Sequence, residues 1–168
     1  MVDRTKQTNM KQLEGLNEND LIFYDIETAR AVDVLEEETP IYEAWKYKSR
    51  YGSNELNKKT GKDFTIEEYF YEKAPLYAVF GRVVSVIIGR IKNNKVHLKS
   101  YTSYDEKELL ENLNKDLNTV FAKNPKSRFV SFNGVGFDTP YLEKRSIING
   151  VKPATLISEG HLEPWKVT

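Results

Sequence analysis

The chain has 168 residues, enough for one domain with a buried core. It contains no cysteine, which excludes a disulfide scaffold and a thiolate metal site. Its 25 basic and 25 acidic residues leave no net charge, which argues against a protein that coats nucleic acid nonspecifically. No apolar run approaches the roughly 20 residues of a membrane helix, and the polar N-terminus lacks the apolar segment of a signal peptide. We therefore expect a cytoplasmic protein with no membrane partner.

The first part of the chain contains one clear strand. Residues 1–19 are polar and show no apolar period, so we expect a flexible N-terminal arm before a domain that spans 20–168. Leu21–Tyr24 is a short apolar run, which predicts a buried strand. Two carboxylates, Asp25 and Glu27, follow this run directly.

The stretch of about 30–79 is the hardest to assign, and we interpret it as an insertion. Apolar and aromatic residues in 39–52 predict a short helix, whereas the composition of 52–63 is that of a loop. A second helix is expected over 64–75. There Thr65, with a glutamate three residues later, has the pattern of a capping box.

The clearest local signal lies in the middle of the chain. The runs 81–91 and 95–103 read as two strands, and the asparagines between them favour the positive φ angles of a tight hairpin turn. The first run is apolar almost throughout, and the second alternates as a strand with one wet face does. Leucines at helical spacing then predict a helix over 105–125.

The last assignable part contains a strand and a helix. Residues 128–134 predict a fourth strand, and 138–150 predict a helix with Asp138 as its N-cap, Pro140 in the first turn and Gly150 at its end. The order of strands and helices indicates an α/β layered domain with a mixed sheet.

The two acids after the first strand are the first candidate site. Residues i and i+2 of a strand point to the same face, roughly 6.5–7 Å apart, so Asp25 and Glu27 project together. Such a pair repels unless a cation lies between the carboxylates, and a hard divalent cation such as Mg²⁺ prefers oxygen ligands. The alternative is that the strand has ended and both acids are simply solvated.

A second constellation lies between the fourth strand and the last helix. An apolar strand leads into Asn133 and Gly134, and Phe137 and Asp138 follow at the start of a helix. An acid placed after one strand, beside acids placed after another, can contribute to a shared metal site. The alternatives are a plain turn at Asn133, a core role for Phe137, and N-capping by Asp138.

These two segments, "FYDIET" and "SFNGVGFDTPYL", together resemble the first two motifs of the DEDD superfamily of 3′–5′ exonucleases. The resemblance covers roughly 21–150 and is greatest to the proofreading domains of family-B DNA polymerases and their stand-alone relatives. It implies an α/β ribonuclease H-like fold, with a mixed five-stranded sheet flanked by helices. It also implies hydrolysis of single-stranded DNA from its 3′ end, as in replication proofreading, with a DNA polymerase or another replication protein as a further partner.

The resemblance also implies a metal site with two divalent cations, Mg²⁺ or Mn²⁺. Asp25 would bridge both cations, Glu27 would hold the one that activates water, and Asp138 would support the second through water. Two cations of this kind clamp the attacking and leaving oxygens of a phosphoryl transfer.

Three further residues would contact the substrate in this family. Thr28 and Asn133 would form hydrogen bonds with the terminal nucleotide, and Phe137 would pack beneath the site or against a base.

The family pattern has a fourth acid, an aspartate with a tyrosine or histidine four residues before it, and this pattern is absent after Asp138. His161 is the nearest candidate base, but the glutamates around it do not have the motif spacing, and an ordinary loop histidine is the simpler interpretation. Three explanations remain. The chain is a truncated form with weak or no activity alone, the missing acid comes from another chain, or the domain is degenerate.

The degenerate case defines the alternative function, a noncatalytic module that binds nucleic acid or a polymerase on the same fold. Its DNA binding would not depend on Asp25 or Glu27. The segment 42–59 mixes aromatic with basic residues and is one possible surface for bases to stack on. The alternative for this segment is a solvated helix whose aromatic residues face the core.

Overall fold

The computed structural model describes residues 16–155, 157 and 161–162. Most of the arm expected over 1–19 therefore lies outside the described residues. The described part of that segment contains a short 3-10 turn, η1 (Glu18–Asp20), in which the side chain of Asn17 accepts a hydrogen bond from the backbone of Asn19 (3.0 Å).

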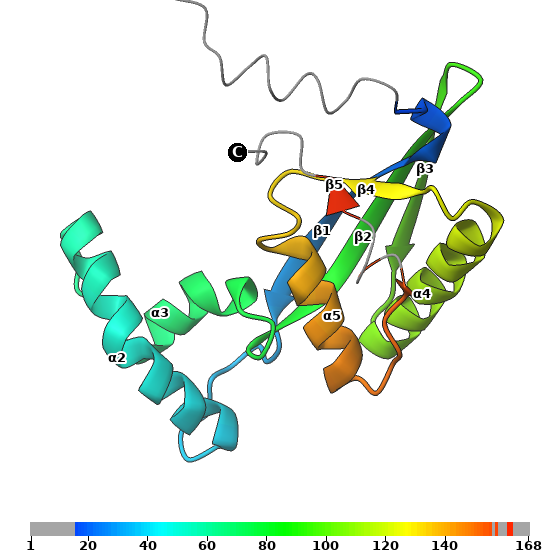
Figure 1. The fold of residues 1–168 in the computed structure, drawn as a ribbon. Helices are drawn as coiled ribbons and strands as arrows, with labels where there is room; N and C mark the ends of the chain where they lie inside the picture. The colour runs from blue at the N-terminus through cyan, green and yellow to red at the C-terminus, as the bar shows by residue number, and fades with distance from the viewer. Residues whose placement is uncertain (1–15, 156, 158–160, 163–168) are drawn as a thin grey trace, which may run out of the picture. The chain divides into compact units, whose positions relative to one another are not determined.

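The described residues form a mixed sheet flanked by helices (Figure 1). The strand order is β3-β2-β1-β4-β5. β2 and β3 pair antiparallel, β1 and β4 pair parallel, and β4 and β5 pair parallel. This architecture confirms the expected α/β fold with a five-stranded sheet. The elements are, in chain order, β1 (Leu21–Arg30), α2 (Pro40–Thr60), α3 (Ile66–Lys73), η2 (Ala74–Leu76), β2 (Gly81–Lys92), β3 (Lys95–Thr102), α4 (Glu106–Lys123), β4 (Arg128–Val130), α5 (Asp138–Ile148) and β5 (His161–Leu162).

The chain divides into two compact units. Unit 1 comprises 1–27 and 84–168, and unit 2 comprises 28–83. Strands β1 and β2 each contribute residues to both units. The expected division into an arm, a domain and an insertion at about 30–79 remains a prediction.

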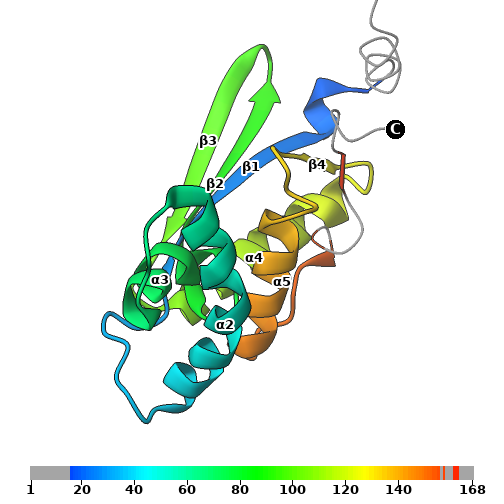
Figure 2. The same cartoon turned by 90° about the vertical axis from the view of Figure 1, so that its left-hand side faces the viewer.

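The sheet of unit 1 has one face covered by helices. Tyr24 of β1 forms a hydrogen bond with Thr139 of α5, and Tyr101 of β3 donates one to Asp116 of α4 (2.9 Å). Helices α4 and α5 are themselves joined by an ion pair between Glu106 and Arg145. Both helices therefore lie on the same side of the sheet (Figure 2). The core between them is built mainly from the leucines of α4, which are Leu109, Leu110, Leu113 and Leu117.

The hairpin between β2 and β3 forms as predicted. Asn93 and Asn94 both have positive φ, at 54° and 55°, which is the conformation that a two-residue turn of the primed type requires. Asparagine tolerates this conformation better than most residues because its side chain can bond locally.

Unit 2 is built around the indole of Trp45, which is completely buried. Its ring contacts those of Tyr69, Phe70 and Phe80 at centroid distances of 5.3, 5.2 and 4.9 Å. The indole N–H donates to the carbonyl oxygen of Ile66 (3.1 Å), so the polar atom of this side chain is also satisfied.

The loop predicted over 52–63 is wrong, because α2 continues through Gly52 to Thr60. At Gly52 the helix passes so close to α3 that a Cβ atom would lie 2.0 Å from the hydroxyl oxygen of Tyr69. The glycine thus permits close packing and does not end the helix. The helix ends at Gly61, whose φ of 70° is the left-handed conformation typical of a helix C-terminus.

The capping box predicted for α3 is confirmed. The Thr65 hydroxyl accepts from the backbone of Glu68 (3.1 Å), and the Glu68 carboxylate accepts from the backbone of Thr65 (3.0 Å). The hydrogen bond from the Thr65 backbone to the carboxylate, together with the charge of Lys62, holds the pKa of Glu68 below its ordinary value.

Two predicted strands have different lengths in the structure. β1 extends from Leu21 to Arg30, well beyond the predicted end at Tyr24, and β4 covers only Arg128–Val130 of the predicted 128–134. Within the described part of the chain, no helix is long and apolar enough to cross a membrane.

Candidate active site

Asp25 and Glu27 both lie on the exposed face of β1. The buried residues Ile22, Tyr24 and Ile26 alternate with them along the strand, so both carboxylates point away from the core. The prediction that they share a face is confirmed. They do not follow the strand, however, because β1 continues past them and pairing is still present at Ala31, whose N–H donates to the carbonyl oxygen of Phe80 (2.9 Å).

A tight turn leads from β4 to α5. Asn133 has a φ of 57°, and its carbonyl oxygen accepts hydrogen bonds from the N–H groups of Gly136 and Phe137, both at 2.9 Å. At Gly134 a Cβ atom would lie 1.8 Å from the hydroxyl oxygen of Ser131 and 2.5 Å from that of Tyr24. The turn therefore requires glycine at this position, because side chains of β1 and β4 occupy the space.

Asp138 is the first residue of α5 and is 4% exposed. The prediction that Asp138 is the N-cap is wrong by one residue. Phe137 holds that position because the helix begins at Asp138, and its ring has no oxygen that could accept a capping hydrogen bond. A carboxylate in the first helical turn is stabilised by the partial positive charge of the helix N-terminus.

One buried hydrogen bond connects the two candidate segments. The hydroxyls of Tyr24 and Thr139 lie 2.6 Å apart. Tyr24 directly precedes Asp25, and Thr139 directly follows Asp138. The register of β1 and β4, in which Phe23 pairs with Val130, places the start of the turn at the same edge of the sheet as the acids. The sequence analysis missed Tyr24 and Thr139, although Tyr24 could have been found as the buried neighbour of the two exposed acids.

The donor chemistry of the acid pair fits a hard divalent cation. Two exposed carboxylates, two residues apart on a strand, offer oxygen ligands on one face. No group of three or more His, Cys, Asp or Glu side chains within the described residues is arranged to hold a metal ion. Asp25, Glu27 and Asp138 therefore do not form such a group, and their roles as metal ligands remain predictions.

The remaining predicted residues have the following surroundings. The hydroxyl of Thr28 donates to the carbonyl oxygen of Pro75 (2.9 Å) within unit 2. Asn133 is exposed, and the half-buried ring of Phe137 packs against that of Tyr141 at 5.4 Å. His161 pairs through its backbone with Phe129 in the sheet. The substrate-binding roles of these residues remain predictions.

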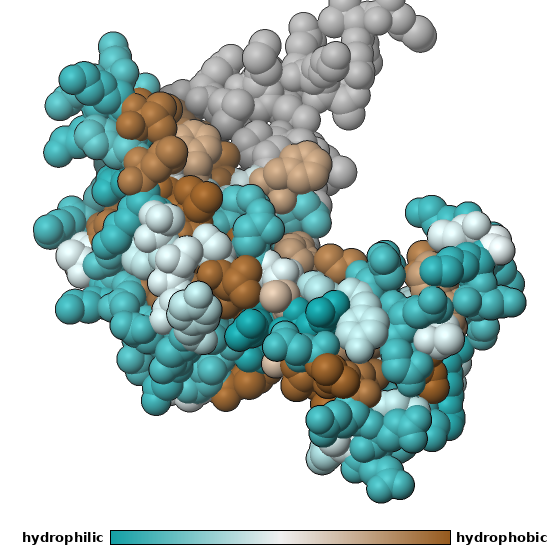
Figure 3. Space-filling view, turned by 180° about the vertical axis from the view of Figure 1, so that it is seen from behind, coloured by the Kyte–Doolittle hydropathy of each residue, from teal (hydrophilic) through white to brown (hydrophobic). Residues whose placement is uncertain are grey.

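Among the described residues, no helix covers the face of the sheet that carries the acids, and this face is apolar. Phe23, Ile87, Val96 and Leu98 are all exposed there. Gly89 lets two strands approach closely, because a Cβ atom at this position would lie 3.2 Å from Leu98 and 3.5 Å from Phe23. The view from behind shows apolar side chains gathered over the β2–β3 hairpin (Figure 3). The carboxylates thus border an apolar surface.

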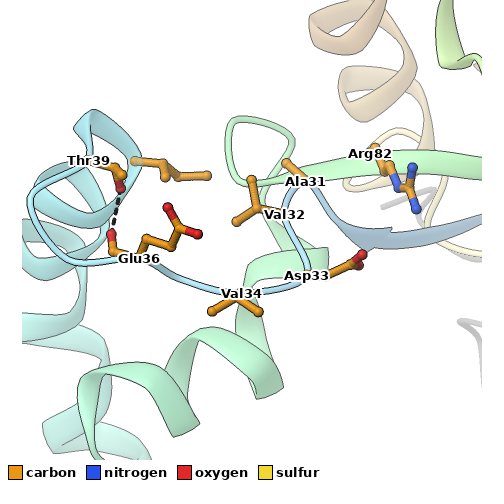
Figure 4. A pocket seen from close by; sticks show the side chains of 8 residues that line it. Ala31, Val32, Asp33, Val34, Glu36, Thr39 and Arg82 are labelled. Carbon is orange, nitrogen blue, oxygen red and sulfur yellow. Dashed lines mark hydrogen bonds between the residues drawn. The ribbon is translucent and has the colours of Figure 1, made fainter.

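Unit 2 contains a separate open pocket of about 490 Å³. The carboxylates of Asp33 and Glu36 and the guanidinium of Arg82 border it, and the Glu36 carbonyl accepts a hydrogen bond from the Thr39 hydroxyl (2.7 Å; Figure 4). The other residues that line the pocket are Ala31, Val32, Val34 and Ile41. This mixture of charges belongs to unit 2 and is distinct from the acid pair of unit 1.

A comparison with known families now adds to this geometry. The family model for the "Predicted 3'-5' exonuclease related to the exonuclease domain of PolB" matches residues 75–166. The matched range contains Asn133, Phe137 and Asp138 and begins after Asp25 and Glu27. No protein with a curated description matches the chain. The match covers more than half of the sequence and agrees with the ribonuclease H-like fold expected of a DEDD-type exonuclease. The chain therefore belongs to the family of predicted 3′–5′ exonucleases related to the exonuclease domain of PolB.

Proposed function

We propose that the chain is a metal-dependent 3′–5′ exonuclease that hydrolyses phosphodiester bonds at the 3′ ends of single-stranded DNA. One observation carries this proposal. Asp25 and Glu27 lie on the same exposed face of the central strand, and Asp138 begins the helix whose first turn is bonded to that strand.

The two exposed carboxylates would hold divalent cations, Mg²⁺ or Mn²⁺, together with water and the phosphate oxygens of the substrate. Cations bound there supply activation of the attacking water and stabilisation of the charge on the leaving oxygen. Through these cations, Asp25 and Glu27 would hold the scissile phosphate at the exposed face of β1. Asp138, at the start of α5, would support the second cation through water.

Residues of the turn would hold the terminal nucleotide. The exposed side-chain amide of Asn133 can form hydrogen bonds with the sugar or base, and the ring of Phe137 can pack beside it. In the reaction, a water oxygen forms a bond to phosphorus and the bond from phosphorus to the 3′ oxygen breaks. The shortened strand keeps a 3′-hydroxyl, and the released nucleotide carries a 5′-phosphate.

We expect weak turnover by this chain alone. The sequence after Asp138 contains no aspartate and therefore lacks the acid of the last family motif. One missing ligand costs transition-state stabilisation on the order of several kcal/mol. A direct measurement of metal binding is therefore the better first test.

The test is calorimetric titration of the chain with Mn²⁺, with Asp25→Asn as the variant and Asp33→Asn as the matched control. Asp33 is an exposed aspartate of unit 2, so its variant makes the same chemical change away from the acid pair. The wild type and Asp33→Asn should bind Mn²⁺ alike, and Asp25→Asn should bind at least about tenfold more weakly because one of two carboxylate ligands is gone. Equal binding by all three would overturn the assignment of the metal site.

A nuclease assay tests the reaction itself. With Mg²⁺ or Mn²⁺, single-stranded DNA labelled at its 5′ end should shorten by one nucleotide at a time, and Asp25→Asn should slow this at least about 100-fold. DNA binding without shortening, unchanged in Asp25→Asn and Glu27→Gln, would instead support the noncatalytic module that binds nucleic acid or a polymerase.

A further inference from the structure

Helix α2 of unit 2 has two different aromatic faces. Tyr42 and Trp45 are buried in the core, whereas Tyr47 and Tyr51 are 66% and 73% exposed. The core of unit 2 therefore contains only some of the aromatic residues of α2. The outward pair has no role in the packing around Trp45.

The two exposed tyrosines form an ordered pair. They lie four residues apart on the helix, and their ring centroids are 6.4 Å apart with the planes at 73°. Contact between the rings limits the side-chain freedom of both, so less entropy is lost when a ligand packs against them. Helical geometry places Arg50, Asn54 and Lys58 on the same side, because the spacings of three and four residues return to one face. From Tyr47 to Lys58 this surface is about 16 Å long.

The helix also concentrates positive charge. Within Pro40–Thr60 there are five basic residues and two acidic ones, an excess of three positive charges in a chain whose net charge is zero. The remainder of the chain consequently carries an excess of three negative charges. The basic residues are Lys46, Lys48, Arg50, Lys58 and Lys59.

We infer that the exposed face of α2, formed by Tyr47, Arg50, Tyr51, Asn54 and Lys58, binds single-stranded DNA. Every base offers a ring that can stack on tyrosine without regard to sequence, and nearby cations can bind the phosphates between stacked bases. Helix α2 as a whole has an excess of positive charge, which complements this polyanion, and the chain belongs to a family of predicted exonucleases. This surface lies outside the proposed metal site, and its binding requires neither metal nor hydrolysis.

The experiment measures binding of fluorescein-labelled oligo(dT) by fluorescence anisotropy in EDTA, with Asp25→Asn as the parent protein so that no DNA is cut. The double variant Tyr47→Ala/Tyr51→Ala should bind about tenfold or more weakly, because the stacking surface is lost. Tyr47→Phe/Tyr51→Phe keeps both rings and should bind within about twofold of the parent. Tyr104→Ala is the matched control, since Tyr104 is a fully exposed tyrosine of unit 1.

The charge contribution is tested by its salt dependence. Arg50→Gln/Lys58→Gln should make the negative slope of log K against log salt concentration shallower by about 1.4, the value expected for the loss of two contacts to single-strand phosphates. The control pair Lys95→Gln/Lys126→Gln removes two exposed lysines outside α2 and should leave the slope unchanged.

Any of four results would overturn the inference. The parent does not bind single-stranded DNA, or the Tyr47→Ala/Tyr51→Ala variant binds it as tightly as the Tyr104→Ala control. Alternatively, both charge pairs reduce the salt dependence equally, or the parent binds duplex DNA as tightly as the single strand. Because the parent lacks Asp25, the outcome is separate from that of the metal titration and the nuclease assay.

Discussion

Unit 1 and unit 2 stabilise their cores in different ways. The core of unit 2 is an aromatic cluster around Trp45, and its stability depends on ring packing. Unit 1 combines the leucines of α4 with buried polar contacts that join separate elements, such as the nearly buried pair of Glu106 and Arg145, with a Nε to Oε1 distance of 2.9 Å.

The difference indicates where precise geometry matters. Polar contacts are directional, so they fix the position of neighbouring groups more closely than apolar packing does. In unit 1 one such contact, between the hydroxyls of Tyr24 and Thr139, joins the two segments of the candidate active site. In unit 2 the ring contacts around Trp45 outnumber its one polar contact, from the indole N–H to Ile66, and two tyrosines are exposed on the same helix.

The largest expected effect is in the core of unit 2. Trp45→Ala should lower the free energy of unfolding by about 3–5 kcal/mol, since it removes a fully buried indole and leaves a cavity. Tyr47→Ala on the exposed face of the same helix should change it by less than about 0.5 kcal/mol. Urea unfolding measures both, and hydrogen exchange should show early loss of protection in 28–83. Simultaneous loss of protection throughout the chain would show that the two units unfold together.

The next effect compares one glycine from each unit. Gly134→Ala should cost about 1–3 kcal/mol, because the new Cβ atom meets the side chains of both Ser131 and Tyr24. Gly52→Ala should cost less, since Tyr69 contacts it through the end of its side chain and alanine adds about 1 kcal/mol of helix propensity. Thermal unfolding measures the difference, and a larger cost at Gly52 would contradict the contrast between the units.

A smaller effect is expected at the hydrogen bond between the two site segments. Tyr24→Phe should cost about 0.5–1.5 kcal/mol, the usual net contribution of one hydrogen bond. Thr139→Val should cost a similar amount, and the double variant should cost much less than the sum, because both single changes remove the same bond. Thr139→Ser keeps the hydroxyl that Thr139→Val removes, so it should be more stable than Thr139→Val. Additive losses would show that the two hydroxyls act independently.

The smallest effect is a dependence on pH in unit 1. Hydrogen bonding to Lys99, with a further bond from Tyr101, holds the pKa of Asp116 below its ordinary value, while burial and this same bond raise the pKa of Tyr101. A carboxylate whose pKa is lower when folded stabilises the protein above its unfolded pKa, and this contribution is lost as the pH falls through the folded pKa.

Asp116→Asn should therefore be less stable than the wild type at pH 7, by at most about 1 kcal/mol because the pair is partly exposed. The difference in the free energy of unfolding should shrink as the pH falls below about 4, where the carboxylate of Asp116 becomes protonated. Urea unfolding across this range measures it, with Asp33→Asn as the control. A difference that persists in acid would show that the amide disturbs packing and that charge is not the cause.

Local sequence signals predicted several elements correctly. The asparagines of the hairpin, the capping box of α3 and the leucine period of α4 each depend on neighbours within a few residues. The shared face of Asp25 and Glu27 likewise follows from the period of a strand alone. The end of β1 could not be predicted in this way, because strand pairing with a distant segment, as at Ala31 and Phe80, extends it past the charged residues.

Two glycines show most clearly where prediction from neighbouring residues fails. Gly52 suggested a loop, yet it lies within α2, where the end of the Tyr69 side chain of α3 occupies the space of a Cβ atom. No residue near Gly52 in sequence reveals this contact. Gly134 suggested a turn, and there the local interpretation agrees with the structure. A Cβ atom would meet Ser131, three residues away, and also Tyr24, more than a hundred residues away.

By itself, the sequence determined the α/β class and the order of most strands and helices, because these follow from the spacing of apolar residues. It also determined that Asp25 and Glu27 share one face of a strand, because residues two apart in a strand point the same way. Only the tertiary structure decided which residues join the two motifs and which aromatic residues of α2 face outward. Both depend on contacts between segments far apart in the chain, and the pattern of either segment alone does not specify its partner.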